Sequence, residues 1–149
     1  MLDFGAGKGS LEEFVQEWSL EVGGRQLDWT NYDPGIPEYD TLPDRDFDLV
    51  ITTDVLEHVE PDLLEHVIKQ LEARAGKVMY NDIACYPTGK LFGEGPYKGE
   101  DLHLTVQSPQ WWKDTFKANS TLHMAEYHWR SKYSRGKYKD RCMMIHERV

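Results

Sequence analysis

Three glycines near the start of the chain, Gly5, Gly7 and Gly9, stand at alternate positions. They follow an apolar segment that carries Asp3, and they precede a segment with helical periodicity at 10–20. Glycine has no Cβ and adopts positive φ readily, so its backbone can pass close to a bound molecule. A strand, a glycine-rich turn and a helix in this order predict the nucleotide-binding corner of an open α/β sheet.

Two further acidic residues, Asp33 and Asp54, follow predicted strands in the order that such a corner requires. Asp33 ends the strand predicted over 27–32, where an acidic side chain can accept hydrogen bonds from both hydroxyls of a ribose. The segment Asp33-Pro34-Gly35 also fits a simple turn that Asp33 caps with its own side chain. Both interpretations of Asp33 remain open from the sequence.

Asp54 follows the clearest buried strand, 47–53, and Glu57 comes three residues later. That spacing predicts a capping box, with Asp54 as the N-cap and Glu57 at the third position of a short helix. The position also lies at a strand end, so we expect residues 52–55 to contact the ligand. The two roles are compatible, because a cap would fix the backbone that shapes the pocket.

Periodicity and end signals predict the other elements. Leu11, Phe14, Val15 and Trp18 form an apolar stripe on the first helix, which Ser10 and Glu13 would cap. Gly76 is expected to end the second helix, and Ser108-Pro109 to open the third. The predicted helices are 10–20, 63–71 and 108–116, and the predicted strands are 1–4, 27–32, 47–53, 77–84, 121–133 and 139–147, the last two joined by a hairpin at 134–137.

Alternating strands and helices predict one domain, 1–149, of the α/β class. We expect a Rossmann-like, three-layer α/β/α fold whose mostly parallel sheet carries an antiparallel C-terminal hairpin. The segment 34–46 is too short for a full helix and a full strand. No helix precedes the first strand. We therefore expect a reduced fold, with a short or missing third strand and N-terminal helix, or a chain that is incomplete at its N-terminus.

Composition narrows the functional classes. The 149 residues carry a net charge of −9, which argues against broad binding to nucleic acid. However, residues 128–141 hold six Lys or Arg and one Asp, and this basic hairpin could meet an anionic partner, nucleic acid included, or could simply be solvated. No apolar run predicts a membrane span and no signal peptide is recognised. Two cysteines without metal-ligand spacing favour a reducing compartment, so a cytoplasmic location is expected.

The order of motifs resembles the class I S-adenosylmethionine-dependent methyltransferases. The resemblance covers roughly 1–80, and the segment 103–112 is similar to small members from phage and bacterial genomes, which would place a phage-encoded chain in the host cytoplasm. It implies S-adenosylmethionine as cofactor and methyl transfer to an acceptor, a small molecule or a biopolymer, that the sequence does not identify. The motifs are LDFGAGKG at 2–9, YDP at 32–34, DTLP at 40–43 and FDLVITTDVLEHV at 47–59.

The resemblance also assigns roles around the cofactor. Asp3 would help hold the glycine loop and the methionyl amino group, Asp33 would bind the ribose, and Asp40, or Asp44 after a shift in alignment, would contact the adenine. The two carboxylates that open the first helix, Glu12 and Glu13, disfavour a pyrophosphate there and so support a phosphate-free cofactor. The implied cofactor-binding residues are Asp3, Gly5, Gly7, Asp33, Pro34, Asp40 and Asp54.

His103 lies in the long segment 85–107, where acceptor-binding loops occur, and is the predicted general base. It could equally be a structural histidine. Nearby aromatic residues could line an acceptor pocket or simply pack. The set Asp54, Glu57, His58 and His103 vaguely resembles the metal site of small-RNA 3′-terminal 2′-O-methyltransferases, but the sequence Val-Leu-Glu-His is widespread in metal-free methyltransferases, and we expect no metal. The aromatic residues are Tyr86, Tyr97, Trp111 and Trp112.

Two rival functions remain open. One is an enzyme that cleaves S-adenosylmethionine without an acceptor, which incubation with the cofactor alone would reveal. The other is a degenerate binding or assembly module, suggested by the missing covering elements. Exposed sheet edges could then pair between subunits, so a homodimer is compatible with the sequence.

Overall fold

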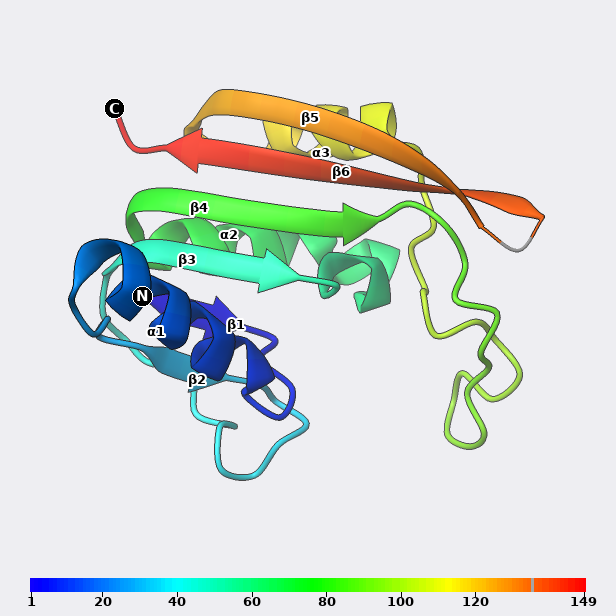
Figure 1. Cartoon of the computed structure of the whole chain (residues 1–149). Helices are drawn as coiled ribbons and strands as arrows, with labels where there is room; N and C mark the ends of the chain where they lie inside the picture. The colour runs from blue at the N-terminus through cyan, green and yellow to red at the C-terminus, as the bar shows by residue number, and fades with distance from the viewer. Residues whose placement is uncertain (135) are drawn as a thin grey trace.

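The computed structural model describes residues 1–134 and 136–149; Arg135, within the basic hairpin, lies outside the described residues (Figure 1). The described chain forms a six-stranded sheet in the order β2-β1-β3-β4-β6-β5. Its elements are β1 (Leu2–Phe4), α1 (Ser10–Gly23), β2 (Thr30–Tyr32), β3 (Phe47–Thr53), the 3-10 turns η1 (Leu56–His58) and η2 (Pro61–Leu63), α2 (Leu64–Arg74), β4 (Ala75–Ala84), α3 (Pro109–Asn119), β5 (His123–Ser134) and β6 (Lys137–Glu147).

The sheet is parallel from β2 through β4 and antiparallel beyond. The last strand, β6, lies between β4 and β5, so the C-terminal hairpin completes the edge of the sheet. The predicted Rossmann-like fold with an antiparallel hairpin is confirmed. The segment between β2 and β3 contains no strand among the described residues, as the short spacing predicted.

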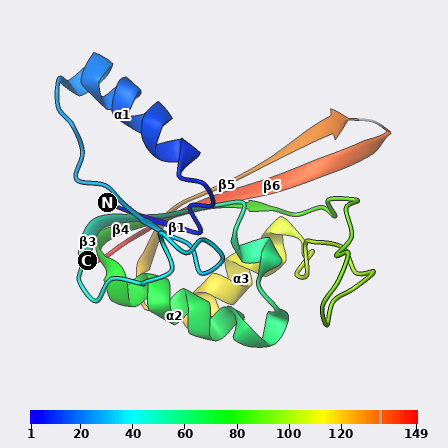
Figure 2. The ribbon, with the colours of Figure 1, turned by 90° about the horizontal axis from the view of Figure 1, so that it is seen from below.

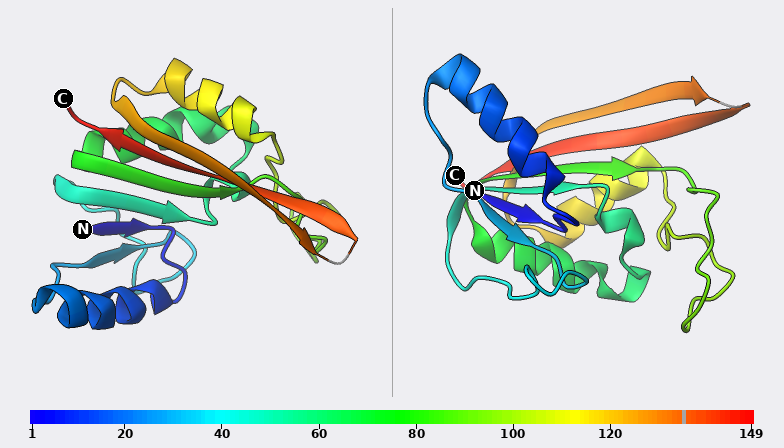
Figure 3. Two further views of the ribbon diagram at one scale, coloured as in Figure 1. Left: turned by 45° about the horizontal axis from the view of Figure 1, so that its top comes forward. Right: turned by 60° about the horizontal axis from the view of Figure 1, so that its bottom comes forward.

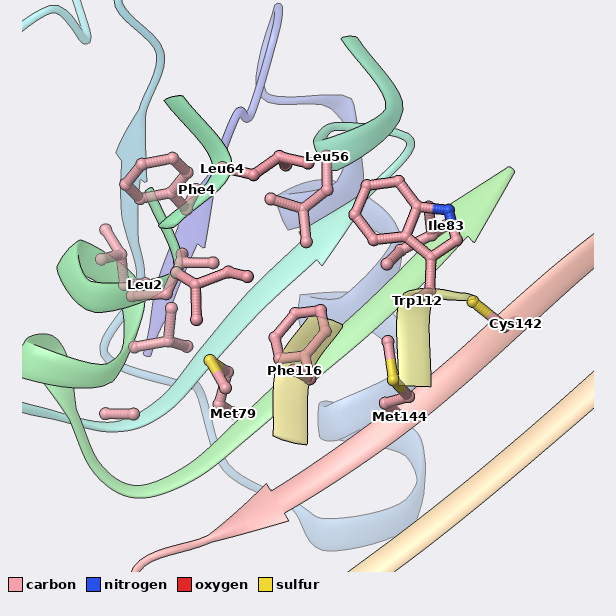
Figure 4. Packing of buried hydrophobic residues seen from close by; sticks show 14 of the residues in the cluster. Leu2, Phe4, Leu56, Leu64, Met79, Ile83, Trp112, Phe116, Cys142 and Met144 are labelled. Atoms are coloured by element: carbon pink, nitrogen blue, oxygen red, sulfur yellow. The ribbon is translucent and has the colours of Figure 1, made fainter. Parts of the chain in front are cut away.

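The helices form the two outer layers. Figures 2 and 3 show α1 on one face of the sheet and α2 with α3 on the other. The hydrophobic core lies between the sheet and the α2–α3 layer, where Leu2, Met79, Ile68 and Phe116 pack together (Figure 4). Burial of such side chains is the main favourable term in folding.

Helix α1 packs less closely than its apolar pattern predicted. Leu11 and Val15 are half-buried, whereas Phe14 is 69% exposed and Trp18 is 57% exposed. No second helix covers this face within the described residues, and α1 spans only the β1 side of it (Figure 2). Only one side of the predicted apolar stripe, Leu11 and Val15, is therefore partly buried, and the other side, Phe14 and Trp18, faces outward.

Two predicted helix ends are wrong and one is confirmed. The N-cap of α1 is Gly9, at φ 75°, with no side-chain cap, so the expected capping box at Ser10 does not form. Helix α2 passes directly into β4 through Ala75, and Gly76 lies inside that strand. Ser108 does cap α3, because its hydroxyl accepts a hydrogen bond from the backbone N–H of Trp111.

The carboxyl ends of the parallel strands meet at one end of the sheet. The distal part of the β5–β6 hairpin and the segment 85–107 project from that same end (Figure 1). Ligands of open α/β sheets bind outside the carboxyl ends of the strands. No helix among the described residues is long and apolar enough to cross a membrane.

Candidate functional site

The glycine loop between β1 and α1 is held close to the end of β2. The backbone N–H groups of Gly5 and Ala6 donate to the carbonyl oxygen of Tyr32, at 2.8 and 3.0 Å. Gly5 has φ 85°, and a Cβ built there would lie 2.5 Å from a methyl carbon of Val55. Only glycine fits this position, and the predicted loop is confirmed.

Asp33 ties the ends of β1 and β2 together. Its Oδ2 accepts the backbone N–H of Gly7 at 2.8 Å, and its Oδ1 accepts the N–H of Gly35 at the same distance. The turn-capping interpretation is therefore confirmed. Each carboxylate oxygen can accept more than one hydrogen bond, so Asp33 keeps capacity for a ligand.

A cleft of about 370 Å³ opens beside this carboxylate, and we call it the strand-end cleft. Asp33 and Pro34 line one part of it, and Asp54, Val55 and His58 line another. Apolar side chains, among them Phe4, Val59 and Val67, complete the wall, and Gly5 lies in it too. The volume and the mixed lining are typical of a small-molecule site. Four of the residues predicted to bind cofactor thus meet in one cleft: Gly5, Asp33, Pro34 and Asp54.

A second hollow, of about 340 Å³, adjoins the cleft through Gly5 and contains Asp3, Ala6 and Thr53 in its lining. Asp3 is only 3% exposed. Burial, together with the neighbouring carboxylates of Asp33 and Glu12, raises the pKa of Asp3 to about 6. A cation bound in this loop hollow would favour the ionised form of Asp3.

The other two predicted cofactor residues lie outside both hollows. Gly7 adopts φ 54° and its N–H donates to Asp33, so it holds that carboxylate in place. Asp40 is exposed, accepts a hydrogen bond from the Thr41 hydroxyl, and lines neither hollow. The adenine-contacting role of Asp40 stays a prediction.

Asp54 has a different local role from the predicted one. The 3-10 turn η1 starts after Val55 without a side-chain cap, so the expected capping box is wrong. Asp54 instead adopts φ 55°, a strained region for a residue with a side chain. Its carboxylate accepts a hydrogen bond from Nη1 of Arg141 at 2.6 Å, and its N–H donates to the Asp82 carbonyl.

Arg141 joins the ends of β3, β4 and β6. Its Nε donates to Asp82 at 2.9 Å while its Nη1 pairs with Asp54. These two carboxylates raise the pKa of the Arg141 guanidinium against the opposing effect of burial. The ion pair fixes Asp54 and its strained backbone at the rim of the strand-end cleft.

Glu57 precedes the cleft residue His58 in the chain and is fully buried. Its Oε1 accepts the backbone N–H of Ala84 at 2.8 Å, whereas its Oε2 has no hydrogen-bond partner among the described residues. Burial raises the pKa of Glu57 to about 7. Glu57 is thus a structural link between η1 and the end of β4.

Two histidines lie edge to face, with ring centroids of His58 and His103 4.7 Å apart. Nδ1 of His58 lies 2.8 Å from the Leu102 carbonyl, and Nδ1 of His103 lies 2.5 Å from the Tyr86 carbonyl. A carbonyl oxygen only accepts, so each Nδ1 carries a proton, and in the neutral ring Nε2 holds the lone pair.

Only His58 of this pair lines the strand-end cleft. His103, the base predicted from the sequence, is 8% exposed and packs behind His58. From the sequence, His58 is a candidate only as a metal ligand. The signal that could have pointed to it is its place just after the end of β3, four residues beyond Asp54.

The remaining candidates serve mostly in packing or local ties. Trp112 belongs to the core, and the Tyr97 hydroxyl donates to Glu60 at 2.9 Å. No group of three or more His, Cys, Asp or Glu side chains in the described part of the chain is arranged to hold a metal ion. The two candidate carboxylates, Asp54 and Glu57, have partners of their own.

No family model matches the chain, and no curated protein matches it. Solved structures do. An 18%-identical match is magnesium protoporphyrin IX methyltransferase (ChlM) from Synechocystis PCC 6803 with bound SAH (S-adenosylhomocysteine), which covers 99% of this chain and 73% of that one at a TM-score of 0.59. DhpI, also solved with SAH, is 15% identical over 95% of this chain and 74% of its own, at a TM-score of 0.55.

A third match, 1,6-didemethyltoxoflavin-N1-methyltransferase from Burkholderia thailandensis, was solved with bound 1,6-didemethyltoxoflavin and S-adenosylhomocysteine. It is 15% identical, covers 99% of this chain and 70% of that chain, and has a TM-score of 0.61. The chain has the class I methyltransferase fold. In this methyltransferase fold the glycine loop, the end of β2 and the end of β3 surround the strand-end cleft, as the sequence predicted.

Proposed function

We propose that this protein transfers a methyl group from S-adenosylmethionine to an acceptor. The observation that carries the proposal is the strand-end cleft, in which the glycine loop and the half-buried Asp33 carboxylate adjoin an apolar wall. A nucleoside needs those features, because its sugar is polar and its base is flat and apolar. The methyltransferase fold of the chain supports the same assignment.

The residues of the two hollows fit the parts of this cofactor. Asp33 would accept hydrogen bonds from the ribose hydroxyls, and Pro34 and Val55 would contact the adenine. The loop hollow would take the methionyl end, where the buried Asp3 carboxylate offers a partner for its ammonium group. The raised pKa of Asp3 supports this fit, since a buried carboxylate without a cation is costly.

The bound cofactor would supply a methyl group activated by its positively charged sulfur. The acceptor's lone pair would form the new bond to this carbon, and the carbon–sulfur electron pair would return to sulfur as a neutral thioether. The chain's own residues mainly align the partners, which accounts for much of such a rate. His58 lines the cleft with Nε2 available, so that nitrogen would accept the proton that the acceptor loses. His103 would position His58, and its own role as base stays a prediction.

Calorimetric titration with S-adenosylhomocysteine tests the cofactor site. Asp33→Ala is expected to weaken binding at least tenfold, through the loss of charge-assisted hydrogen bonds worth about 1.4 kcal/mol or more. Asp62→Ala removes an exposed carboxylate of η2 that lines neither hollow, and it should leave the affinity unchanged. Unchanged affinity in a folded Asp33→Ala protein would remove Asp33 from the site.

A second measurement separates methyl transfer from its rivals. Incubation of the protein with S-adenosylmethionine alone should give little turnover, because a transferase needs an acceptor. Rapid release of cofactor fragments would instead indicate the acceptor-independent cleaving enzyme. Absence of cofactor binding would favour the degenerate module.

A further inference from the structure

A groove of about 430 Å³ lies between the β5–β6 hairpin and the start of the segment 85–107. We call it the basic groove, because four of its lining residues are cationic and none of the described ones is acidic. This composition stands out in a protein of net charge −9. The lining residues are Tyr86, Arg130, Lys132, Ser134, Lys139 and Arg141.

The strand register places like charges directly opposite each other. Arg130 pairs with Arg141, and two residues further along the hairpin Lys132 pairs with Lys139. Residues two apart on a strand point to the same face, so both pairs face the groove. Like charges in directly opposed positions destabilise a hairpin. Two such pairs in succession are costly unless an anion compensates them.

Carboxylates compensate only the first pair. Arg141 binds Asp54 and Asp82, and Arg130 lies 3.7 Å from the second of these. Neither Lys132 nor Lys139 forms an ion pair with a described residue; the ammonium of Lys139 lies instead over the Tyr86 ring, 4.9 Å from its centre. The two lysines thus offer an uncompensated double positive charge beside an aromatic ring.

The basic groove adjoins the strand-end cleft through a single ion pair. Asp54 lines the cleft, Arg141 lines the groove, and their side chains are 2.6 Å apart. The two histidines make a second connection, because His58 lines the cleft and His103 packs against both His58 and Tyr86. A molecule held in the groove would therefore reach toward the cofactor's methyl end.

We propose that the methyl acceptor is a small molecule with a carboxylate or phosphate group, and that Lys132 and Lys139 bind this oxyanion in the basic groove. The proposal rests on the proposed function and names its substrate class. The size of the groove fits a small ligand. The acidic remainder of the protein would repel a long polyanion, so a nucleic acid strand is the weaker fit.

The test uses the full chain and measures two ligands independently. Phenyl phosphate and benzoate serve as probes of the two oxyanions, and benzyl alcohol as their uncharged counterpart, in titrations followed by NMR at low ionic strength. We expect phenyl phosphate or benzoate to bind and benzyl alcohol not to. Whichever anion binds more tightly identifies the group that the acceptor carries.

The double variant Lys132→Gln with Lys139→Gln should weaken anion binding at least tenfold. Each lysine makes a charge-assisted contact with the anion, and the loss of one such contact lowers affinity about tenfold. Lys69→Gln removes one exposed positive charge from α2, where it pairs with Glu65, and should leave anion binding unchanged. Both variants should bind S-adenosylhomocysteine as the parent protein does, and their melting curves report whether they fold.

The outcomes separate this proposal from the proposed function. If S-adenosylhomocysteine binds but neither anion does, or if the double variant binds the anion as well as the parent, the oxyanion site is overturned. If S-adenosylhomocysteine itself does not bind, the proposed function fails. Tighter binding of a short single-stranded oligonucleotide than of either small anion would replace the small acceptor with a nucleic acid.

Discussion

The buried carboxyl group of Asp3 reduces the stability of the ligand-free protein, because no cationic group of the described residues compensates its charge. It lies on β1 with its side chain buried toward α1, and its pKa is raised from 3.8 to about 6. The folded protein therefore holds a proton on Asp3 that the unfolded chain releases between these two values. By linkage, the free energy of unfolding falls as the pH rises from about 4 to 6, and the loss persists above that range.

Asp3→Asn should consequently stabilise the ligand-free protein at pH 8, by about 3 kcal/mol for a shift of this size. The same change should weaken S-adenosylhomocysteine binding, because the ammonium group of the ligand loses its carboxylate partner. Urea unfolding at pH 8 and calorimetry report the two effects separately. A variant that is stabilised but binds the ligand with unchanged affinity would show that Asp3 faces no cation.

At the scale of elements, Glu57 connects three of them at the carboxyl ends of the strands. Its side chain accepts the N–H of Ala84 at the end of β4, and its backbone carbonyl accepts the N–H of Thr105. The 3-10 turn η1, the strand β4 and the segment 85–107 thus meet at one buried residue, Glu57. Burial raises its pKa from 4.5 to about 7, so ionisation of Glu57 destabilises the folded protein even though the N–H of Ala84 favours the charged form.

Glu57→Gln keeps an acceptor for Ala84 and cannot ionise. We expect the variant to lose the decline in unfolding free energy that Glu57 causes as the pH rises from about 4.5 to 7, and so to gain stability relative to the parent at pH 8. Glu57→Ala leaves the N–H of Ala84 without a partner and creates a cavity, and it should cost about 1–3 kcal/mol. Equal pH dependence in the parent and the Gln variant would contradict the raised pKa.

Local patterns predicted the elements well where the deciding contacts are close in sequence. Ser108 caps α3 as expected, and the spacing after Asp33 correctly excluded a full third strand. The capping boxes at Ser10 and Asp54 failed for different reasons: the positive φ of Gly9 starts α1 without a side chain, and Arg141 holds the Asp54 carboxylate.

The remaining features, which the sequence could not predict, depend on contacts between residues far apart in the chain. Asp54 and Arg141 are separated by 87 positions, and only the insertion of β6 beside β4 brings them together. The basic residues of the hairpin were visible in the sequence, but their pairing into opposed like charges required the strand register. His58 and His103 likewise meet only because the segment 85–107 folds back over η1.

At the scale of the whole molecule, buried titratable groups act in opposite directions on its pH stability. Asp3 and Glu57 reduce the unfolding free energy as the pH rises, whereas His146 reduces it as the pH falls. His146 lies in the core, stacked on Phe116 at 4.9 Å between ring centres, and neither ring nitrogen has a hydrogen-bond partner among the described residues. Burial lowers its pKa from 6.5 to about 4.

Between pH 6.5 and 4 the unfolded chain therefore binds a proton at His146 that the folded protein does not bind. The free energy of unfolding falls as the pH is lowered through that range. His146→Leu, which keeps a similar volume and has no titratable group, should remove this acid-dependent loss of about 2–3 kcal/mol. Unfolding free energies at pH 7 and pH 4.5 measure this loss, and His66→Leu, which removes an exposed histidine of α2, serves as the control.

The parent should lose more stability than His146→Leu on acidification, while the control should follow the parent. If all three proteins lose stability equally, the acid sensitivity of this molecule does not arise in its core.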